Sequence, residues 1–186
     1  MNKKATEEQV IEYLRELDPG RYPLELFKEF ARLNVLASVE VIPLRWHEGK
    51  VQVLLMKRPK GDVWEDQWHA PGTMMLPTDS IAYDHDFADP FGRVLGKNGE
   101  LDEIITIGEP VLVGSERRKS LRGDEFSSIY YVEVSGGEPK DGTFVYVDEN
   151  FPPTDESFVI IDYHINMIIK ATREFVKLKE LHRSFI

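Results

Sequence analysis

Two groups of charged side chains in this sequence are suited to chemistry on a phosphate ester. Carboxylates gather between residues 79 and 103, and Glu125 follows later in the chain. Carboxylate oxygens are the usual protein ligands of Mg²⁺ bound to substrate phosphates. The segment ERRKSLR holds the basic side chains Arg117, Arg118, Lys119 and Arg122. This segment is either a solvated loop or a local anion site on an acidic protein.

The charge and composition of the chain exclude several classes of protein. Nucleic-acid-binding proteins usually carry a basic patch, so the formal net charge of −10 argues against a nucleic-acid partner. The sequence has no cysteine, which excludes disulfides and thiolate metal sites. No apolar run approaches the roughly 20 residues of a membrane span, and MNKKATEEQV lacks the apolar core of a signal peptide. We expect a cytoplasmic protein without a membrane partner.

The elements that would position these groups form a strand-rich middle between helical ends. Alternating apolar residues predict strands over 36–46, 50–58, 103–114, 125–135 and 142–149. The first two are joined by HEGK, with Gly49 at the hairpin turn. The C-terminal segment predicts an amphipathic helix from Phe158, Ile161, Ile165, Ile168 and Phe175. This order predicts one α/β domain over residues 36–186, with a sheet covered by helices.

The apolar spacing in residues 1–35 predicts a helical extension before that domain. In residues 6–17, Thr6 can cap a helix whose apolar face carries Val10, Tyr13, Leu14 and Leu17. A second short helix is predicted over 23–34. The extension could pack on the domain or contact a second copy of the chain, and packing is the commoner role.

Residues 76–102 form an unusually long connection between predicted strands. Its first half, residues 76–89, contains four aspartates and a histidine: Asp79, Asp84, Asp86, Asp89 and His85. Its segment PFGRVLGKN could form a helix, although Gly92 and Gly96 each weaken a helix by roughly 1 kcal/mol relative to alanine. We interpret the connection as either a functional loop or a mobile one.

Two long strings resemble the Nudix hydrolases. VQVLLMKRPKGDVWEDQWHAPGTMM resembles the strand, loop and strand before the catalytic box of that family, and GDEFSSIYYVEVSGGEPKDGTFVYVDE resembles its later strands. The resemblance spans about residues 36 to 178. It implies a Nudix-type α/β/α sandwich with a mixed β-sheet, here preceded by the N-terminal helical extension.

The catalytic box of that family reads G-x5-E-x7-R-E-U-x-E-E-x-G-U, where U is a bulky apolar residue. The resemblance implies that its helical glutamates hold Mg²⁺ on a pyrophosphate. With Thr73 at the glycine position, Asp79 takes the first glutamate position. About six extra residues then bring Arg93 to the arginine position. The later glutamate positions hold Val94, Lys97 and Asn98, and Glu100 lies two places beyond an expected acid, within reach if the helix is shifted.

The resemblance suggests roles for a small set of residues. The candidate catalytic residues are Asp79, Glu100 and Glu125. The candidate metal ligands are Asp79, Glu100 and Glu103. The candidate substrate-binding residues are Arg58, Trp68, Gly72, Arg93 and Arg118.

Several of these residues have a structural alternative. Asp79 is more often a helix N-cap than a metal ligand, and Arg93 more often pairs with an acid such as Asp79. The acidic turn with Glu100 and Glu103 could simply be solvated. Trp68, with Trp64 four residues before it, more often packs than stacks on a base. His69 and His164 are expected to pack in the core.

The resemblance predicts a Mg²⁺-dependent hydrolase that acts on a nucleoside diphosphate linked to another moiety, such as a nucleotide sugar. The altered box leaves an alternative, a catalytically inactive Nudix domain that binds a nucleotide or a protein partner. We expect a nucleotide-type small molecule as substrate, no nucleic acid or membrane as partner, and a homodimer as a possible assembly.

Overall fold

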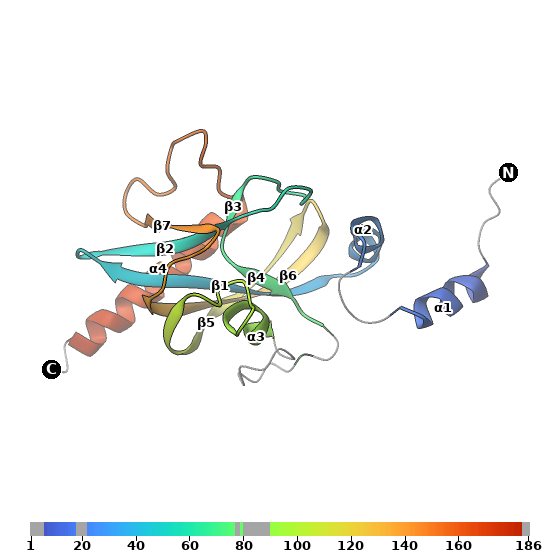
Figure 1. The fold of residues 1–186 in the computed structure, drawn as a ribbon, viewed down its shortest axis with the longest axis horizontal. Coiled ribbons are helices and arrows are strands. Elements are labelled where there is room, and N and C mark those ends of the chain that lie inside the picture. The colour runs from blue at the N-terminus through green and yellow to red at the C-terminus, as the bar shows by residue number, and fades with distance from the viewer. Residues whose placement is uncertain (1–5, 18–21, 77–78, 80–89, 184–186) are drawn as a thin grey trace.

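A computed structural model describes residues 6–17, 22–76, 79 and 90–183 (Figure 1). Its elements in chain order are α1 (Glu7–Arg15), α2 (Leu24–Leu33), β1 (Leu36–His47), β2 (Lys50–Lys57), β3 (Trp68–His69), β4 (Gly72–Met74), α3 (Pro90–Leu95), β5 (Ile105–Ser120), β6 (Gly123–Gly136), β7 (Gly142–Tyr146) and α4 (Asp162–Arg183). No helix in this part of the chain is long and apolar enough to cross a membrane.

The strands form one mixed sheet. Its order is β3-β2-β1-β6-β5, with β4 paired to β1 and β7 paired to β2. Strands β1 and β6 run parallel, and the other pairs are antiparallel. The first half of β1 pairs with β4 on the edge away from β6, and its last residues pair with β2. The predicted mixed sheet is confirmed, and β1 is its central strand, since it pairs with β2, β4 and β6.

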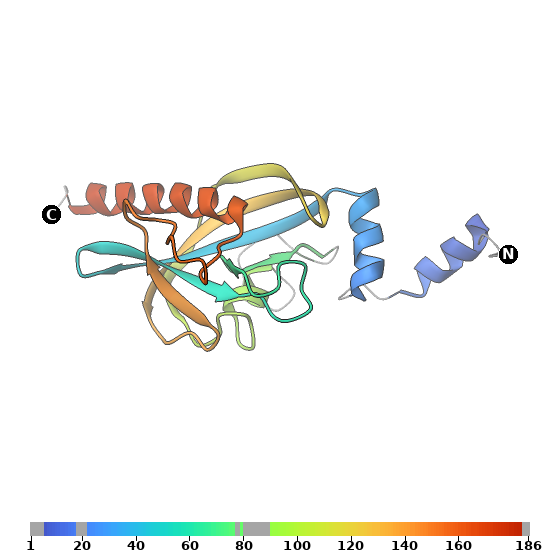
Figure 2. The ribbon, with the colours of Figure 1, turned by 90° about the horizontal axis from the view of Figure 1, so that it is seen from above.

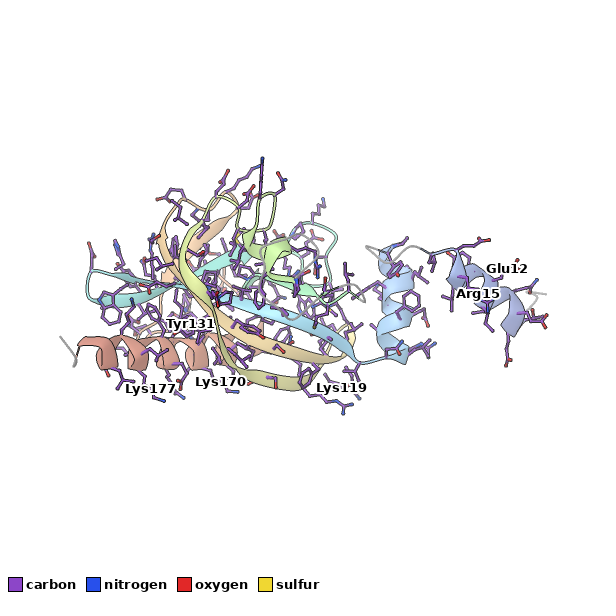
Figure 3. The ribbon with its side chains drawn as sticks, turned by 90° about the horizontal axis from the view of Figure 1, so that it is seen from below. Glu12, Arg15, Lys119, Tyr131, Lys170 and Lys177 are labelled. Carbon is purple, nitrogen blue, oxygen red and sulfur yellow. The ribbon has the colours of Figure 1, made fainter. Side chains whose placement is uncertain are left out.

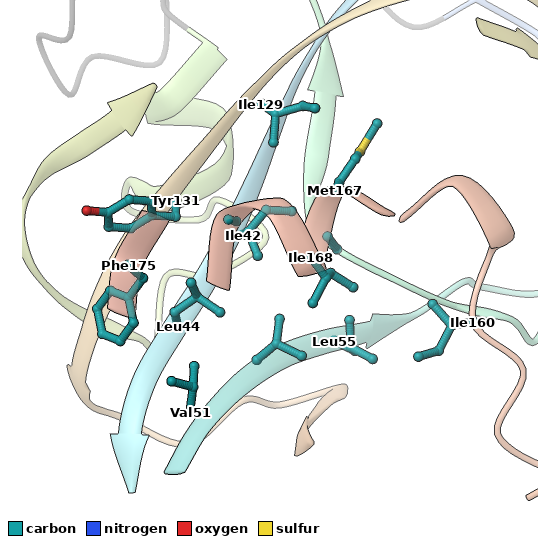
Figure 4. Packing of buried hydrophobic residues seen from close by; sticks show 13 residues of the cluster. Ile42, Leu44, Val51, Leu55, Ile129, Tyr131, Ile160, Met167, Ile168 and Phe175 are labelled. Carbon is teal, nitrogen blue, oxygen red and sulfur yellow. The ribbon is translucent and has the colours of Figure 1, made fainter. Parts of the chain in front are cut away.

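Helices cover both faces of the sheet (Figures 1 and 2). One core cluster lies under α4, where Ile42, Leu44 and Phe175 are buried (Figure 4). A second cluster packs under α3 and includes Val41 and Val94. Successive residues of β1 enter opposite clusters because side chains alternate across a strand. The α/β/α sandwich predicted from the sequence is confirmed.

The two N-terminal helices differ in how they meet the domain. Helix α1 has the expected cap, since the side chains of Thr6 and Gln9 form a capping box. None of its residues is buried, and it stands away from the sheet in both ribbon views. Helix α2 packs against the start of β6, where Ala31 is buried. The expected packing of the extension is thus seen for α2 and not for α1.

Helix α4 begins later than the apolar spacing predicted. Phe158 and Ile161 precede its first residue, Asp162, and still pack into the core. The solvent-facing side of the helix carries Lys170 and Lys177 (Figure 3), and Lys170 reaches Glu116 of β5 in an ion pair. The apolar pattern therefore predicted the buried side of this segment correctly and placed its first turn too early.

Candidate active site

Gly72 lies where β4 meets β1, and only a glycine fits there. It pairs with Glu40 in the antiparallel register of β1 and β4. A Cβ atom at this position would lie 2.3 Å from Glu40 Oε2 and 2.9 Å from the Val39 carbonyl oxygen. Both distances are shorter than real Cβ contacts, so the glycine lets a carboxylate lie directly against the backbone.

Substituting Gly72 by alanine should therefore destabilise the protein. We expect a loss of about 1–3 kcal/mol, the usual cost of forcing extra atoms into a packed site, measured by urea denaturation. Gly136→Ala is the matched control, because a Cβ there would meet only Ile105 Cδ1 at 3.6 Å. Equal stability of the Gly72→Ala variant and the control would contradict the close approach.

Glu100 reaches the same glycine from the turn that follows α3. Its Oε2 atom accepts a hydrogen bond from Gly72 N at 3.3 Å, and its Oε1 atom lies 3.5 Å from His69 Nε2. The turn is held in place because Leu101 is buried in the second core cluster. Two carboxylates, from Glu40 and Glu100, thus lie against Gly72 from different segments of the chain.

His69 is a buried, neutral histidine. Its Nδ1 atom lies 2.7 Å from the Ala70 carbonyl oxygen, which can only accept, so Nδ1 carries the proton. Burial, with a smaller contribution from the nearby Arg58 guanidinium, lowers the pKa of His69 to about 3. Nε2 is then an acceptor that faces the Glu100 carboxylate. The expected burial of His69 is confirmed, and its Nε2 lone pair is on the side of Glu100.

Glu40 is held from behind by a buried ion network. Arg118 Nη2 donates to Glu40 Oε1 at 3.2 Å and to Glu125 Oε2 at 3.1 Å. Arg122 Nε donates to Glu125 Oε1 at 3.1 Å, and Ser38 Oγ donates to Glu40 Oε1 at 3.1 Å. Burial raises the pKa of Glu40, and Arg118 opposes that rise. The two arginines offset the charge of the two glutamates inside the protein.

The basic segment divides between the interior and the surface. Arg118 and Arg122 belong to the buried network, with side chains that are 10% and 15% exposed. Arg117 is exposed and pairs with Asp124, and Lys119 points outward (Figure 3). The strand alternation of β5 explains why neighbours face opposite sides. The expectation of a loop is therefore wrong, because β5 extends to Ser120, and only Arg117 and Lys119 are solvated.

Asp79 and Arg93 form the structural pair that the sequence predicted. Both Asp79 carboxylate oxygens accept from the Arg93 guanidinium, and Asp79 Oδ2 also accepts from Leu76 N at 2.7 Å. Arg93 donates in addition to the Met74 carbonyl oxygen at 3.0 Å. Burial by itself raises the pKa of Asp79, but these hydrogen bonds outweigh it and the pKa is lowered. This ion pair links the segment after β4 to helix α3.

The predicted metal ligands are not gathered at one point. Within residues 6–17, 22–76, 79 and 90–183, no group of three or more histidine and acidic side chains is placed to hold a metal ion. Asp79, Glu100 and Glu103 therefore do not form the expected ligand set, because Asp79 is engaged by Arg93. His85 and any cap that Asp79 makes to the following residues lie outside the described part of the chain.

The box positions assigned to glutamates do not face the site. Val94 is 1% exposed and belongs to the second core cluster. Lys97 and Asn98 lie on the exposed turn after α3, and Asn98 has a positive φ of 62°. Helix α3 spans only six residues, and its apolar side packs against the sheet. The acid that reaches Gly72 is Glu100, which lies in the turn after the helix.

Trp64 and Trp68 pack within the protein. Trp68 stacks on Phe158, with ring centroids 4.6 Å apart and an interplanar angle of 15°. Trp64 meets the ring of Tyr163 edge-on at 5.8 Å. The packing alternative is thus observed for both rings, and a contact of Trp68 with substrate stays a prediction. Arg58 directly follows β2, and its Nη1 atom lies 3.6 Å from Asp62 Oδ2.

Glu40 was missed by reasoning from the sequence, although a signal was present. Ser38, Glu40, Ile42 and Leu44 lie on one face of β1, and the apolar residues Ile42 and Leu44 indicate that this face is buried. An acid in an inward series must be paired or hydrogen-bonded. Its partner, Arg118, is 78 residues away, so the sequence could have indicated a buried acid without identifying what neutralises it.

Comparison with known proteins supports the fold through structure alone. No protein-family model and no curated protein matches the chain. The Nudix domain of Shewanella oneidensis NrtR, complexed with ADP ribose, matches with a TM-score of 0.55 and 17% identity over 92% of this chain and 99% of that one. A MutT/nudix family protein from Enterococcus faecalis matches with a TM-score of 0.55 and 16% identity over 94% and 71%. The Ap4A hydrolase of C. elegans matches with 0.51 and 8% over 76% and 99%.

This chain therefore has the Nudix fold. The identities are too low to carry more than the fold, and fold does not by itself imply function. The roles of the individual site residues, the cytoplasmic location, the homodimer and the lack of a nucleic-acid partner stay predictions.

Proposed function

We propose that the protein is a Nudix-type hydrolase that acts on a nucleoside diphosphate linked to another moiety, such as a nucleotide sugar. The observation that carries this proposal is the placement of the Glu40 and Glu100 carboxylates against Gly72. The fold is shared with a Nudix domain complexed with ADP ribose and with an Ap4A hydrolase. Glu100 supplies, from the turn after α3, the acid that the helix itself lacks.

The donor atoms at Gly72 suit Mg²⁺ held jointly with a substrate. Mg²⁺ is usually bound by one or two carboxylates together with substrate phosphates and water. Glu100 and Glu40 provide two such carboxylates. When bound, the ion would neutralise phosphate charge and activate water for attack on phosphorus.

The residues around this pair keep it in place. The Gly72 N–H group orients Glu100. Arg118 and Ser38 hold Glu40 through its Oε1 atom, which leaves Oε2 against Gly72. Glu125 acts as a positioning residue in this proposal, because it fixes Arg118 and does not itself reach Gly72.

A second candidate function is a nucleotide-binding domain without catalysis. It is favoured by Val94, Lys97 and Asn98, which stand where the box of catalytic relatives carries glutamates. In this case the domain would bind a nucleotide or a partner protein through the same end of the sheet.

One experiment separates the two candidates. The purified protein is incubated with ADP-ribose, nucleotide sugars, dinucleoside polyphosphates and NADH, in the presence of Mg²⁺ or Mn²⁺, and products are separated by chromatography. We expect release of a nucleoside monophosphate, phosphate or sugar that stops when EDTA is added. Thermal stabilisation by one of these compounds without any product would instead establish the binding domain.

A further inference from the structure

Helix α1 is an amphipathic helix whose apolar side is left uncovered. Thr6 and Gln9 form a complete capping box at its start, yet none of its residues is buried. A helix of nine residues is too short to be stable by itself in water, so this apolar side calls for a surface to pack against. Four side chains that are between 42% and 55% exposed form it: Val10, Ile11, Tyr13 and Leu14.

A second uncovered apolar surface lies at the end of the sheet next to α2. Here the turn between β5 and β6 approaches α2 so closely that a Cβ atom on Gly123 would lie 2.5 Å from the Ala31 carbonyl oxygen. Leu36 pairs with Glu125 in the register of β1 and β6, so the residues before and after them lie diagonally across the two strands. The exposed apolar side chains at this end, called the end patch below, are Leu33, Val35, Leu121 and Phe126.

The two surfaces carry opposite charge. Residues 6–17 contain four glutamates and one arginine, a formal charge of −3. The end patch is bordered by the exposed cations Arg117 and Lys119, and Arg117 lies opposite Phe126 in the register of β5 and β6. Asp124 pairs with Arg117, and two glutamates of α2 are each paired with a cation, so the border stays basic. Two α1 helices packed on each other would instead repel.

The end patch is not covered by the α1 helix of its own chain. In both ribbon views α1 lies beyond α2 and away from the sheet (Figures 1 and 2). In a pair of chains related by a twofold axis, each α1 can cover the end patch of the other chain. Such an exchange makes two equal contacts, which brings the buried area closer to the roughly 1,000 Å² of a specific interface than one contact does.

We propose that two copies of the chain exchange their N-terminal helices, with α1 of each copy packed on the end patch of the other. Helix α1 is then a dimerisation element, and the homodimer expected from the sequence has this interface. The proposal is independent of the proposed function, because neither α1 nor the end patch contains a residue of the candidate active site.

The first test measures the oligomeric state by analytical ultracentrifugation over a range of protein concentrations. The unmodified protein should sediment as a dimer that dissociates on dilution. Leu14→Glu places a charge on the apolar side of α1 and should raise the Kd of the dimer about 30-fold, a size typical of a central interface residue. Gln9→Glu is the matched control, since it adds the same charge and keeps the capping box, and it should dimerise like the unmodified protein.

The second test maps the contact with single thiols, because the chain has no cysteine. A Leu14→Cys chain is mixed with a differently tagged Leu121→Cys chain and treated with a short bismaleimide linker. The main product should join one chain of each kind. In the control mixture Lys177→Cys replaces Leu121→Cys, since Lys177 is exposed on α4, far from α2 (Figure 3), and this mixture should give little of the joined product.

Four results would overturn the helix exchange. The first two are a protein that sediments as a monomer at every concentration and a Leu14→Glu variant that dimerises as well as Gln9→Glu. The third is linkage of Leu14→Cys chains to one another in place of Leu121→Cys chains. The fourth is linkage within a single chain when both cysteines are introduced together, which would place α1 on its own domain. Turnover of substrate tests the proposed function separately.

Discussion

Replacing Arg118 by methionine is expected to lower the free energy of unfolding by about 3–5 kcal/mol. The side chain lies between two acids, Glu40 and Glu125, whose side chains are 6% and 0% exposed. Methionine has a similar length and keeps most of the packing, so the loss comes from two buried carboxylates that lose their shared cation. Breaking a buried ion pair from one side costs more than the pair contributes, because the remaining charge is left in a poorly solvating interior.

The neighbouring residue provides the control for this experiment. Arg117 is 65% exposed and pairs with Asp124 on the surface, and surface ion pairs contribute about 0–1 kcal/mol. Urea denaturation of Arg117→Met and Arg118→Met, analysed for midpoint and slope, should therefore give very different losses. Similar small losses in both variants would mean that the ion network is not buried in solution.

The second large effect is expected on catalysis. Glu100→Gln should reduce kcat with Mg²⁺ by about 10²-fold or more, a size typical of losing one group that stabilises charge in the transition state. The substitution keeps the shape of the side chain and its oxygen acceptor for Gly72 N, while it removes the negative charge. Unfolding measurements should show little change, because the Glu100 side chain is 30% exposed.

Asp102→Asn is the control for Glu100→Gln, since Asp102 is an exposed acid in the same turn. It should keep the activity of the unmodified protein. If both variants are equally active, Glu100 has no part in the reaction and the carboxylate pair at Gly72 is not the catalytic centre. If both are equally impaired, a general loss of negative charge in the turn is responsible.

The fold could be predicted from the sequence because its main signals are local. Alternation in 36–46 and 125–135 predicted two central strands, and both are confirmed as β1 and β6. The resemblance to the Nudix strings predicted that these strands belong to a mixed sheet. Local patterns were weaker at helix ends, where α4 begins at Asp162 and not at the first apolar residue of its pattern.

The candidate site was harder to predict because its contacts are long-range. The pair of Asp79 with Arg93 was predictable, since the box pattern relates these positions directly. Glu40 depends on Arg118 and Gly72, which come from distant strands. Tyr163 was read only as part of a helical segment, because nothing in its neighbourhood shows that Arg118 will lie over its ring.

The burial of Val94 limits how this protein could be re-engineered into a more typical catalyst. The motif suggests glutamate at position 94, but that side chain would enter the cluster that contains Phe91 and Leu101. A buried charge without a partner would cost more stability than a new metal ligand could return. Designers who want a stronger metal centre should instead place an acid at the exposed positions 97 or 98, in the turn that carries the carboxylate already reaching Gly72.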